Sequence, residues 1–544
     1  MENGRHVISL CRKWGLKCEY IASSHRVNDD ESLQYTSTLF GRQPFLPPEI
    51  ASQNAFNMEY FTDNNVDLSG SWEVPLLNSY PTVDPFLPLR VPNTEDIMGE
   101  AMLPVGETLN ELINIFFEHF QHRFPFFQKN TFFSQFQNGT IHAESELLLY
   151  AICTIASSFH PDPAVKTRQN AWYDQAKFLY EFTGRVPQPP LRTIQAALCL
   201  VFHAYTRGDF SACWLYVGKA WRQAASLGMN RADSSNSVRQ GYYTQFEWTP
   251  KTAIEKEECR RTLWVLFMMD RNGSWPTGWP TAVDERHFKI DIPTTEAVFQ
   301  AMTEETDPST LINTPFTPKL NTLISSTSAA KSPLNPFHYL VIVHVLLGRV
   351  TELIHSLHNS PDTLEYAQEC DDLDASLVKL RLSIPRSATS VLEASTEDRD
   401  HAVWLNLILN TTAILLHYRS AGIADPSTAK DYFARAVVAA ENTAQIVKDT
   451  ARISIDLLLS AHIASSIYIA GCVLVIHWRT TGDESCRGDI EVFELVFERM
   501  SDVFTVLGLK FKIAMKRDQE RSDEEILKLR EAGFKGLLAD CSKW

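Results

Sequence analysis

Two cysteines near the N-terminus have the spacing of metal ligands. Six residues separate Cys11 from Cys18, and three of these six are basic: Arg12, Lys13 and Lys17. Such cations lower the pKa of a nearby thiol and suit contact with phosphate. A structural zinc site takes about four ligands, however, and the next cysteine along the chain is Cys153. On this chemistry alone, the better interpretation is two spare cysteines in a mobile tail.

Signatures of catalysis are absent from the sequence. It has no glycine-rich dinucleotide loop, P-loop, HExxH metalloprotease motif or GxSxG nucleophile elbow. The sixteen histidines are spread without the spacing of metal ligands, and the carboxylate pair Asp371/Asp372 lies in a polar helical segment where we expect it to be solvated. We therefore expect that the protein is not an enzyme. An enzyme of unknown chemistry stays open as an alternative.

Composition and charge narrow the class of protein further. The chain has 544 residues, of which 44% are hydrophobic, so it can bury a sizeable core and is not disordered throughout. Its formal net charge is −16, so any contact with nucleic acid must come from a small, locally basic module. Ten scattered cysteines with no secretory leader before them favour a reducing compartment with free thiols.

Residues 21–104 differ in composition from the rest of the chain. Between residues 43 and 104 there are nine acidic residues and one basic residue, Arg90, with prolines and aromatic residues interspersed. No helical or strand period is sustained, which is typical of a disordered linker. We expect a disordered acidic linker over 21–104. The alternative is an acidic, aromatic segment that folds when it docks on a partner.

The periodicity of apolar residues predicts helices from about residue 105 to about residue 530. The first helix begins near Glu107, and its apolar face consists of Leu109, Leu112, Ile113, Phe116, Phe117 and Phe120. Pro125 ends this pattern, and Gly228 marks the end of a helix at 210–229. Later helices are predicted at 404–418, 431–448, 455–477 and 490–507. We expect an all-α fold: one large multi-helical domain, with a flexible surface insertion at 296–336.

One helical segment, at 457–478, is long and apolar enough to cross a membrane. It also carries His462, three serines and a tyrosine. A helix that is apolar all round is what the centre of a large helical domain requires. We therefore expect a buried core helix and no contact with a membrane.

The segment around the two N-terminal cysteines resembles the last third of the fungal six-cysteine binuclear zinc cluster, which ends C-x2-C-x6-C-x-Tyr. Cys11, Cys18 and Tyr20 match the fifth cysteine, the sixth cysteine and the closing aromatic residue. Ile8 stands where the fourth cysteine would fall, and the first three would lie upstream. The resemblance implies that residues 1–20 are a partial DNA-binding zinc cluster. Zinc would then bind only if upstream residues complete the ligand set.

The helical region is similar to the middle homology domain that follows this cluster in fungal transcription factors. Three blocks carry the similarity: Leu112–Phe133, Trp214–Asp233 and Glu257–Pro293. In the third block, the family pattern is matched in order by Glu258, Arg261, Trp264, Asp270, Arg271, Gly278, Pro280 and Pro293. Trp279 departs from the pattern, because the family often has arginine at this position. The core motif blocks of the domain therefore lie within 107–295.

The spacing of the motif residues suggests what each does physically. Glu257 and Arg261, four residues apart, are expected to form an exposed ion pair on a helix, and Trp264 is expected to face the core. Asp270 and Arg271 are expected to end this helix at Asn272-Gly273, with Asp270 paired to an arginine of another helix, Arg222 or Arg231. The main interpretation is that all of these residues are structural. The alternative is a pocket for a small inducer among the helices.

The resemblance implies a nuclear transcription factor that regulates RNA polymerase II transcription by sequence-specific DNA binding. The helical domain would be regulatory. Its implied partners are promoter DNA, transcriptional coregulators, a small-molecule inducer and a second copy of the chain. The alternative is a regulator deficient in DNA binding, which acts through protein contacts because its zinc cluster is incomplete.

Overall fold

The structure is a computed structural model, and it describes residues 102–234, 248–311, 313–329, 336–355, 364–421 and 426–532. Residue contacts divide the chain into two units, 1–88 and 89–544, and all described residues belong to the second. The partial zinc cluster predicted at 1–20 lies outside the described residues. So do its ligand and DNA-contact residues, which are Cys11, Cys18, Arg12, Lys13 and Lys17. The predicted linker also lies outside, apart from its last three residues.

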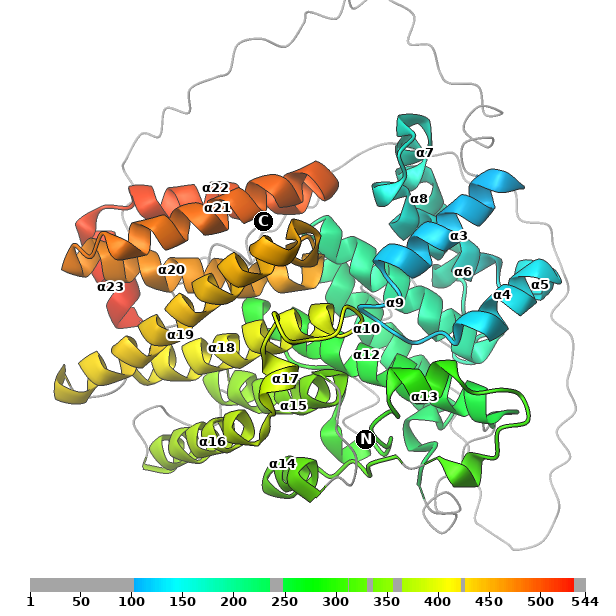
Figure 1. The fold of residues 1–544 in the computed structure, drawn as a ribbon, viewed down its shortest axis with the longest axis horizontal. Helices are drawn as coiled ribbons and strands as arrows, with labels where there is room; N and C mark the ends of the chain where they lie inside the picture. Colours follow the sequence, from blue (N-terminus) through cyan, green and yellow to red (C-terminus); the bar gives the residue numbers. More distant parts are fainter. Residues whose placement is uncertain are drawn as a thin grey trace, which may run out of the picture. The chain divides into compact units, whose positions relative to one another are not determined.

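Helices dominate the described residues, which confirms the all-α fold (Figure 1). The α-helices before residue 250 are α3 (Glu107–His119), α4 (Lys129–Gln137), α5 (Thr140–Glu144), α6 (Glu146–Ala156), α7 (Pro163–Thr167), α8 (Gln169–Glu181), α9 (Pro190–Thr206) and α10 (Phe210–Ser226). Those after it are α12 (Ala253–Thr277), α13 (Glu296–Gln300), α14 (Leu320–Ala329), α15 (Pro336–His355), α16 (Leu364–Ser383), α17 (Arg386–Thr389), α18 (Arg399–Ala421), α19 (Pro426–Ile453), α20 (Ala464–Thr481), α21 (Ser485–Val503), α22 (Thr505–Glu520) and α23 (Asp523–Ala532). The β pairing found among the described residues is an isolated bridge between Ile292 and Thr314.

The apolar face predicted for the first helix is confirmed. All six predicted residues, from Leu109 to Phe120, are buried, and α3 packs against α6. The chain then turns at Pro125, and Phe124 and Phe126 on either side of the proline are also buried. A proline cannot continue the helical hydrogen bonding, so the turn positions these rings in the core before α4 begins.

The 25-residue helix α12 carries the third motif block. Its first turn is capped by Thr252, whose Oγ1 accepts a hydrogen bond from the Glu255 N–H at 3.1 Å. The helix does not end at Asn272-Gly273, so that prediction is wrong; it continues to Thr277 and ends at Gly278, where φ is +72°. The reason is tertiary packing: α9, α10 and α15 surround α12. A Cβ on Gly273 would lie 3.2 Å from the Tyr205 hydroxyl, so the glycine permits close packing inside the helix.

The segment predicted as a flexible insertion, 296–336, includes two short helices, and its flexibility stays a prediction. It contains α13 and α14, and Phe299, Leu323 and Ile324 are fully buried. Helix α14 packs against α15 and α16. These helices were not predicted from the sequence, because α13 has only five residues and α14 is rich in Ser and Thr, so neither is long or apolar enough to show a period. Residues 330–335 lie outside the described part of the chain.

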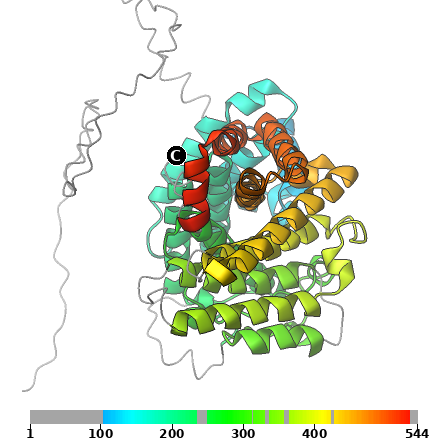
Figure 2. The same cartoon turned by 90° about the vertical axis from the view of Figure 1, so that its left-hand side faces the viewer.

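Helix α20 lies at the centre of the C-terminal helices, in contact with α18, α19, α21, α22 and α23 (Figure 2). Two segments, Pro336–His355 and Ala461–Thr481, are long and apolar enough to cross a membrane, but each is 89% buried inside the protein. Their hydropathy is therefore explained by burial in the core, as the sequence predicted for 457–478. The helix itself begins later than predicted, because short 3₁₀ turns occupy Ile455–Leu458 and Ala461–Ile463.

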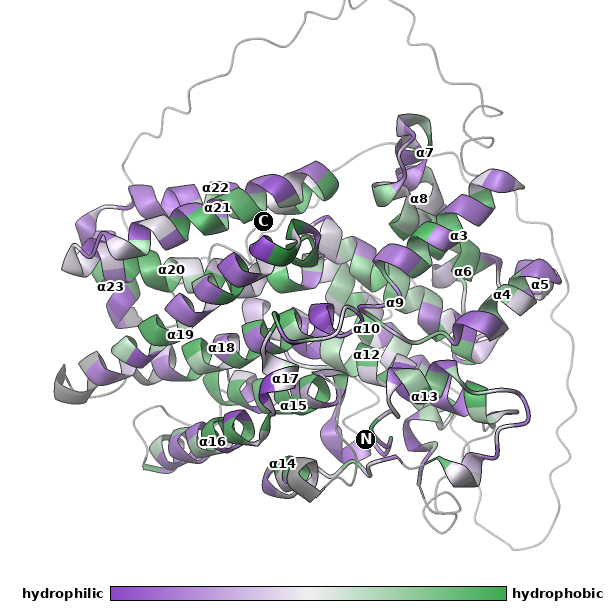
Figure 3. Ribbon diagram, in the orientation of Figure 1, coloured by the Kyte–Doolittle hydropathy of each residue, from purple (hydrophilic) through white to green (hydrophobic). Residues whose placement is uncertain are grey.

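The helix predicted at 490–507 is two helices, α21 and α22, separated at Phe504. The two helices pack closely, and a Cβ on Gly508 would lie 2.3 Å from the backbone nitrogen of Ser501. In Figure 3, helices such as α16 and α21 carry both hydrophilic and hydrophobic residues, as expected of helices with one covered face. Buried apolar residues from Leu109 on α3 to Ile526 on α23 form one connected core.

Candidate functional site

The third motif block lies at the buried centre of the domain. Arg261, Trp264, Asp270 and Arg271 all lie on α12, and each is at most 3% exposed. Trp264 faces the core, as predicted, and its Nε1 donates a hydrogen bond to the Asp291 carbonyl at 2.9 Å. Burying two charged pairs on one helix costs free energy of folding unless each charge has an opposite charge or a hydrogen-bond partner. The partners of these four charges therefore show which segments the helix holds together.

Arg261 joins α12 to two other segments of the chain. Its guanidinium donates to the carbonyls of Pro125, at 3.0 Å, and Thr294, at 2.7 Å. It also pairs with Glu257, at 3.4 Å, and with Glu296 on α13. The Glu257–Arg261 pair is therefore real but buried, and the prediction that it is exposed is wrong. The residues that cover it are the turn at Pro125 and the segment around Thr294, which are distant in sequence.

Arg260, the next residue, links the second and third motif blocks. It forms two hydrogen bonds with the Asp233 carboxylate, at 2.7 and 2.9 Å, and one with Glu257 at 3.0 Å. Burial alone would raise the pKa of Asp233, but hydrogen bonds from Arg260 and Lys256 lower this pKa to about 2. Burial also raises the pKa of the neighbouring Asp291 to about 6, with the Asp233 charge adding to the effect.

Asp270 and Arg271 form a second buried pair. The Asp270 carboxylate binds its neighbour Arg271 at 2.5 Å, and it accepts the N–H groups of Ala282 at 2.9 Å and Val283 at 3.0 Å. The predicted pairing of Asp270 with Arg222 or Arg231 is therefore wrong. The reason is that α12 continues past Asn272, which leaves Asp270 facing the segment that returns after the helix ends.

Gly278 and Pro280 form the turn that starts this returning segment. A Cβ on Gly278 would lie 3.0 Å from His355 Nδ1, so the position needs glycine for space as well as for its positive φ. The Pro280 carbonyl accepts a hydrogen bond from Trp214 Nε1 at 2.8 Å. The rings of Trp214 and Trp279 lie 5.6 Å apart, so Trp279 makes an aromatic contact at the position where the family often has arginine.

A cavity of about 570 Å³ lies beside Arg261. Its walls come from the α3 end, the Pro125 turn, α13 and the starts of α15 and α18, and its polar lining includes Gln121, His122, Lys129, Arg261, Glu296 and His401. The Oε1 atom of Gln121 is buried and has no hydrogen-bond partner. This cavity is of the size that suits a small molecule with polar groups.

Comparison with known proteins supports the resemblance seen in the helical region. Residues 113–376 match the fungal specific transcription factor domain. This match ends within α16, so the helices from α17 to α23 lie beyond it, although they share its hydrophobic core. The predicted zinc-cluster residues 1–20 also lie outside the matched domain.

Curated relatives are named as regulators of transcription. The chain is 25% identical over 289 residues to the Zn(2)-C6 fungal-type transcription factor FTF1c of Fusarium oxysporum f. sp. lycopersici. This alignment covers 51% of the present chain and 28% of the relative. The chain is 24% identical to an uncharacterized transcriptional regulatory protein of Schizosaccharomyces pombe, covering 45% of this chain and 38% of that protein. It is 27% identical to the pigment biosynthesis transcriptional activator pigB of Monascus ruber, covering 28% of each chain.

The matched regions therefore span well under two thirds of the length of each of these relatives. No solved structure matches the chain.

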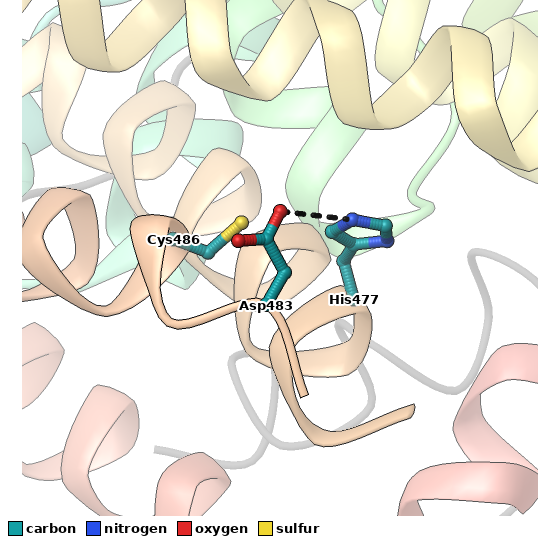
Figure 4. Close-up of side chains that lie close together, drawn as sticks. All are labelled: His477, Asp483 and Cys486. Atoms are coloured by element: carbon teal, nitrogen blue, oxygen red, sulfur yellow. Dashed lines mark ion pairs between the residues drawn. The ribbon is translucent and has the colours of Figure 1, made fainter. Parts of the chain in front are cut away.

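One group of side chains that could hold a metal ion was not predicted from the sequence. His477, Asp483 and Cys486 come together where α20 ends and α21 begins (Figure 4). The spacing H-x5-D-x2-C is present in the sequence. The three side chains can meet, however, only if the chain reverses its direction between His477 and Cys486. Gly482, with φ +75°, marks that reversal, and a glycine between two helical patterns was the available signal.

Proposed function

We propose that the protein is a transcriptional regulator of a fungal nucleus, acting on RNA polymerase II transcription, and that it is not an enzyme. The observation that carries this proposal is the match of residues 113–376 to the fungal specific transcription factor domain. The third motif block is joined to the second by Arg260, which binds Asp233, and to the first by Arg261, which donates to the Pro125 carbonyl. The names of the curated relatives support the same class of function.

We propose that the helical domain, at about 105–530, is regulatory and that residues 1–20 contact promoter DNA. Cys11 and Cys18 would bind zinc together with cysteines supplied from ahead of them, and Arg12, Lys13 and Lys17 would contact phosphate. The acidic segment 21–104 would then connect the two parts as a linker. Sequence-specific binding depends on this cluster, because the net charge of −16 opposes binding by bulk charge.

A second candidate function is a regulator that does not bind DNA and acts only through coregulator proteins. The observation that favours it is Ile8, which stands at the position of the fourth cysteine of the cluster. Two thiolates leave half of a tetrahedral zinc shell to water, and the binding energy that folds a small zinc module is then largely lost.

A gel-shift titration across salt concentrations separates the two functions. The chain of 544 residues is compared with an extended chain that carries the four further cysteines at the family spacing. If the completed zinc cluster gives sequence-specific DNA binding, the extended chain should discriminate between DNA sequences. The chain of 544 residues should then bind DNA weakly, with a strong dependence on salt. Failure of the extended chain to discriminate would overturn the first function and leave the second.

We further propose that a small-molecule inducer occupies the cavity beside Arg261. Ala297, an exposed residue of α13, lines this cavity, whereas the adjacent Val298 does not. Ala297→Trp should therefore fill the cavity and make a reporter insensitive to the growth conditions that normally change its transcription. Val298→Trp is the matched control and should leave the response intact. Equal responses in both variants would contradict this assignment.

A further inference from the structure

Three side chains of metal-ligating type converge at the turn between α20 and α21 (Figure 4). His477 is on the last turns of α20, Asp483 follows Gly482, and Cys486 is on the first turn of α21. One ligand atom from each, the histidine nitrogen, the carboxylate oxygen and the thiol sulfur, lie within 4.8 Å of one another. His477 Nε2 and Asp483 Oδ2 are 3.9 Å apart.

The turn holds the Asp483 carboxylate in a fixed orientation. Its Oδ1 accepts hydrogen bonds from the backbone N–H of Ser485, at 3.0 Å, and from the Ser485 hydroxyl, at 2.7 Å. The other oxygen, Oδ2, is the one directed at His477. A carboxylate whose second oxygen is held by hydrogen bonds is the arrangement that orients ligands in metal sites.

The three side chains differ in their access to solvent. Cys486 is 1% exposed, whereas the side chains of His477 and Asp483 are 24% and 44% exposed. The thiol therefore lies at the inner side of the group, and an ion could enter from the side of the imidazole and the carboxylate.

We propose that His477, Asp483 and Cys486 bind one zinc ion, with a fourth coordination position open to water or to a partner's ligand. Nitrogen, sulfur and oxygen donors together suit zinc, whereas a thiolate disfavours magnesium and calcium. Ligand atoms on one tetrahedral zinc lie about 3.5 Å apart, so the side chains must approach by at most roughly 1.3 Å. The site lies beyond residues 113–376 in the sequence, and its ligands are other residues than Cys11 and Cys18.

The test uses the full chain with Cys11→Ser and Cys18→Ser, so that the N-terminal thiols cannot supply the signal. After incubation with zinc and dialysis, metal analysis should find about one zinc per chain. Cobalt(II) in place of zinc should give a thiolate-to-cobalt absorption band. Absence of both retained zinc and the cobalt band would overturn the proposal.

Variants of the turn identify the ligands. Asp483→Asn and His477→Ala, at partly exposed positions, should each weaken zinc binding by at least about 100-fold, and Ser485→Ala should weaken it by about tenfold. Asp502→Asn is the matched control, because Asp502 is an exposed carboxylate at the other end of α21. Zinc binding that is equally strong in Asp483→Asn and in the control would show that the ligands lie elsewhere.

Discussion

The carboxylate of Asp270 accepts the backbone N–H of Val283 at 3.0 Å, across the turn that follows α12. The same oxygen binds the guanidinium of Arg271, which in turn donates to the Val283 carbonyl at 2.9 Å. Asp270 and Arg271 together therefore satisfy both backbone groups of a fully buried residue. This pair joins the long central helix to the segment that returns along it.

Replacing Asp270 should therefore destabilise the whole domain. Asp270→Ala removes the partner of a buried arginine and leaves two backbone N–H groups unpaired, so we expect a loss of about 3–5 kcal/mol in the free energy of unfolding. Urea unfolding followed by circular dichroism measures the loss. Asp502→Ala, at an exposed position, should change the same quantity by no more than about 0.5 kcal/mol. Similar values for the two variants would contradict the role given to Asp270.

Trp264→Ala should also be strongly destabilising. The ring is fully buried and lies edge-on to Phe267, Phe288 and Phe316, so its removal leaves a large cavity. We expect a loss of about 3–5 kcal/mol, and a smaller loss for Trp264→Phe, which keeps part of the contact. Thermal unfolding of the two variants tests whether Trp264→Ala loses more stability than Trp264→Phe. An unchanged midpoint for Trp264→Ala would mean that this face of α12 is not in the core.

Two glycines of the α21–α22 pair should respond in opposite ways to the same substitution. A Cβ on Gly508 would meet the backbone of Ser501 and Phe497, so Gly508→Ala should cost about 1–3 kcal/mol. Gly488 lies within α21 with nothing near its Cβ position, so Gly488→Ala should stabilise by about 0.5–1 kcal/mol. Comparison of the two free energies of unfolding is the measurement. Equal effects would show that α21 and α22 do not approach closely at Gly508.

The raised pKa of Asp291 predicts a pH-dependent effect. Its pKa is about 6 in the folded protein against an ordinary 3.8, so the folded state favours the protonated carboxyl. The stability that this proton supplies is present at low pH and is lost as the pH rises through 6. Asp291→Asn should therefore be more stable than the wild type at pH 7, with a smaller advantage at pH 4. Urea unfolding at the two pH values tests the sign, and a variant less stable than wild type at pH 7 would contradict it.

The sequence predicted what depends on local periodicity. The buried face of α3 was readable because every third or fourth residue from Leu109 to Phe120 is large and apolar. The end of α12 was misplaced because Asn272-Gly273 is a common turn signal, and the packing of α9, α10 and α15 around the helix cannot be read from the local sequence. The burial of Arg261 could not be foreseen for a similar reason, because Thr294 and Pro125 are distant in sequence.

The candidate metal site shows the same limit. His477, Asp483 and Cys486 lie close in sequence, yet a straight helix would not bring all three together. The angle between α20 and α21 depends on Gly482 and on the packing of both helices against α19. Spacing rules for metal ligands describe known motifs, and H-x5-D-x2-C differs from the spacings of zinc-finger and metalloprotease ligands.

The most direct test of the central claim is a tethered reporter assay in a fungal nucleus. The full chain is fused to an unrelated DNA-binding module, and transcription of a reporter carrying the module's site is compared with that produced by the module alone. If the protein regulates transcription through its helical domain, reporter transcription changes in either direction, and the change disappears in the Asp270→Ala fusion. Unchanged transcription from a fusion that is folded and present in the nucleus would contradict the account.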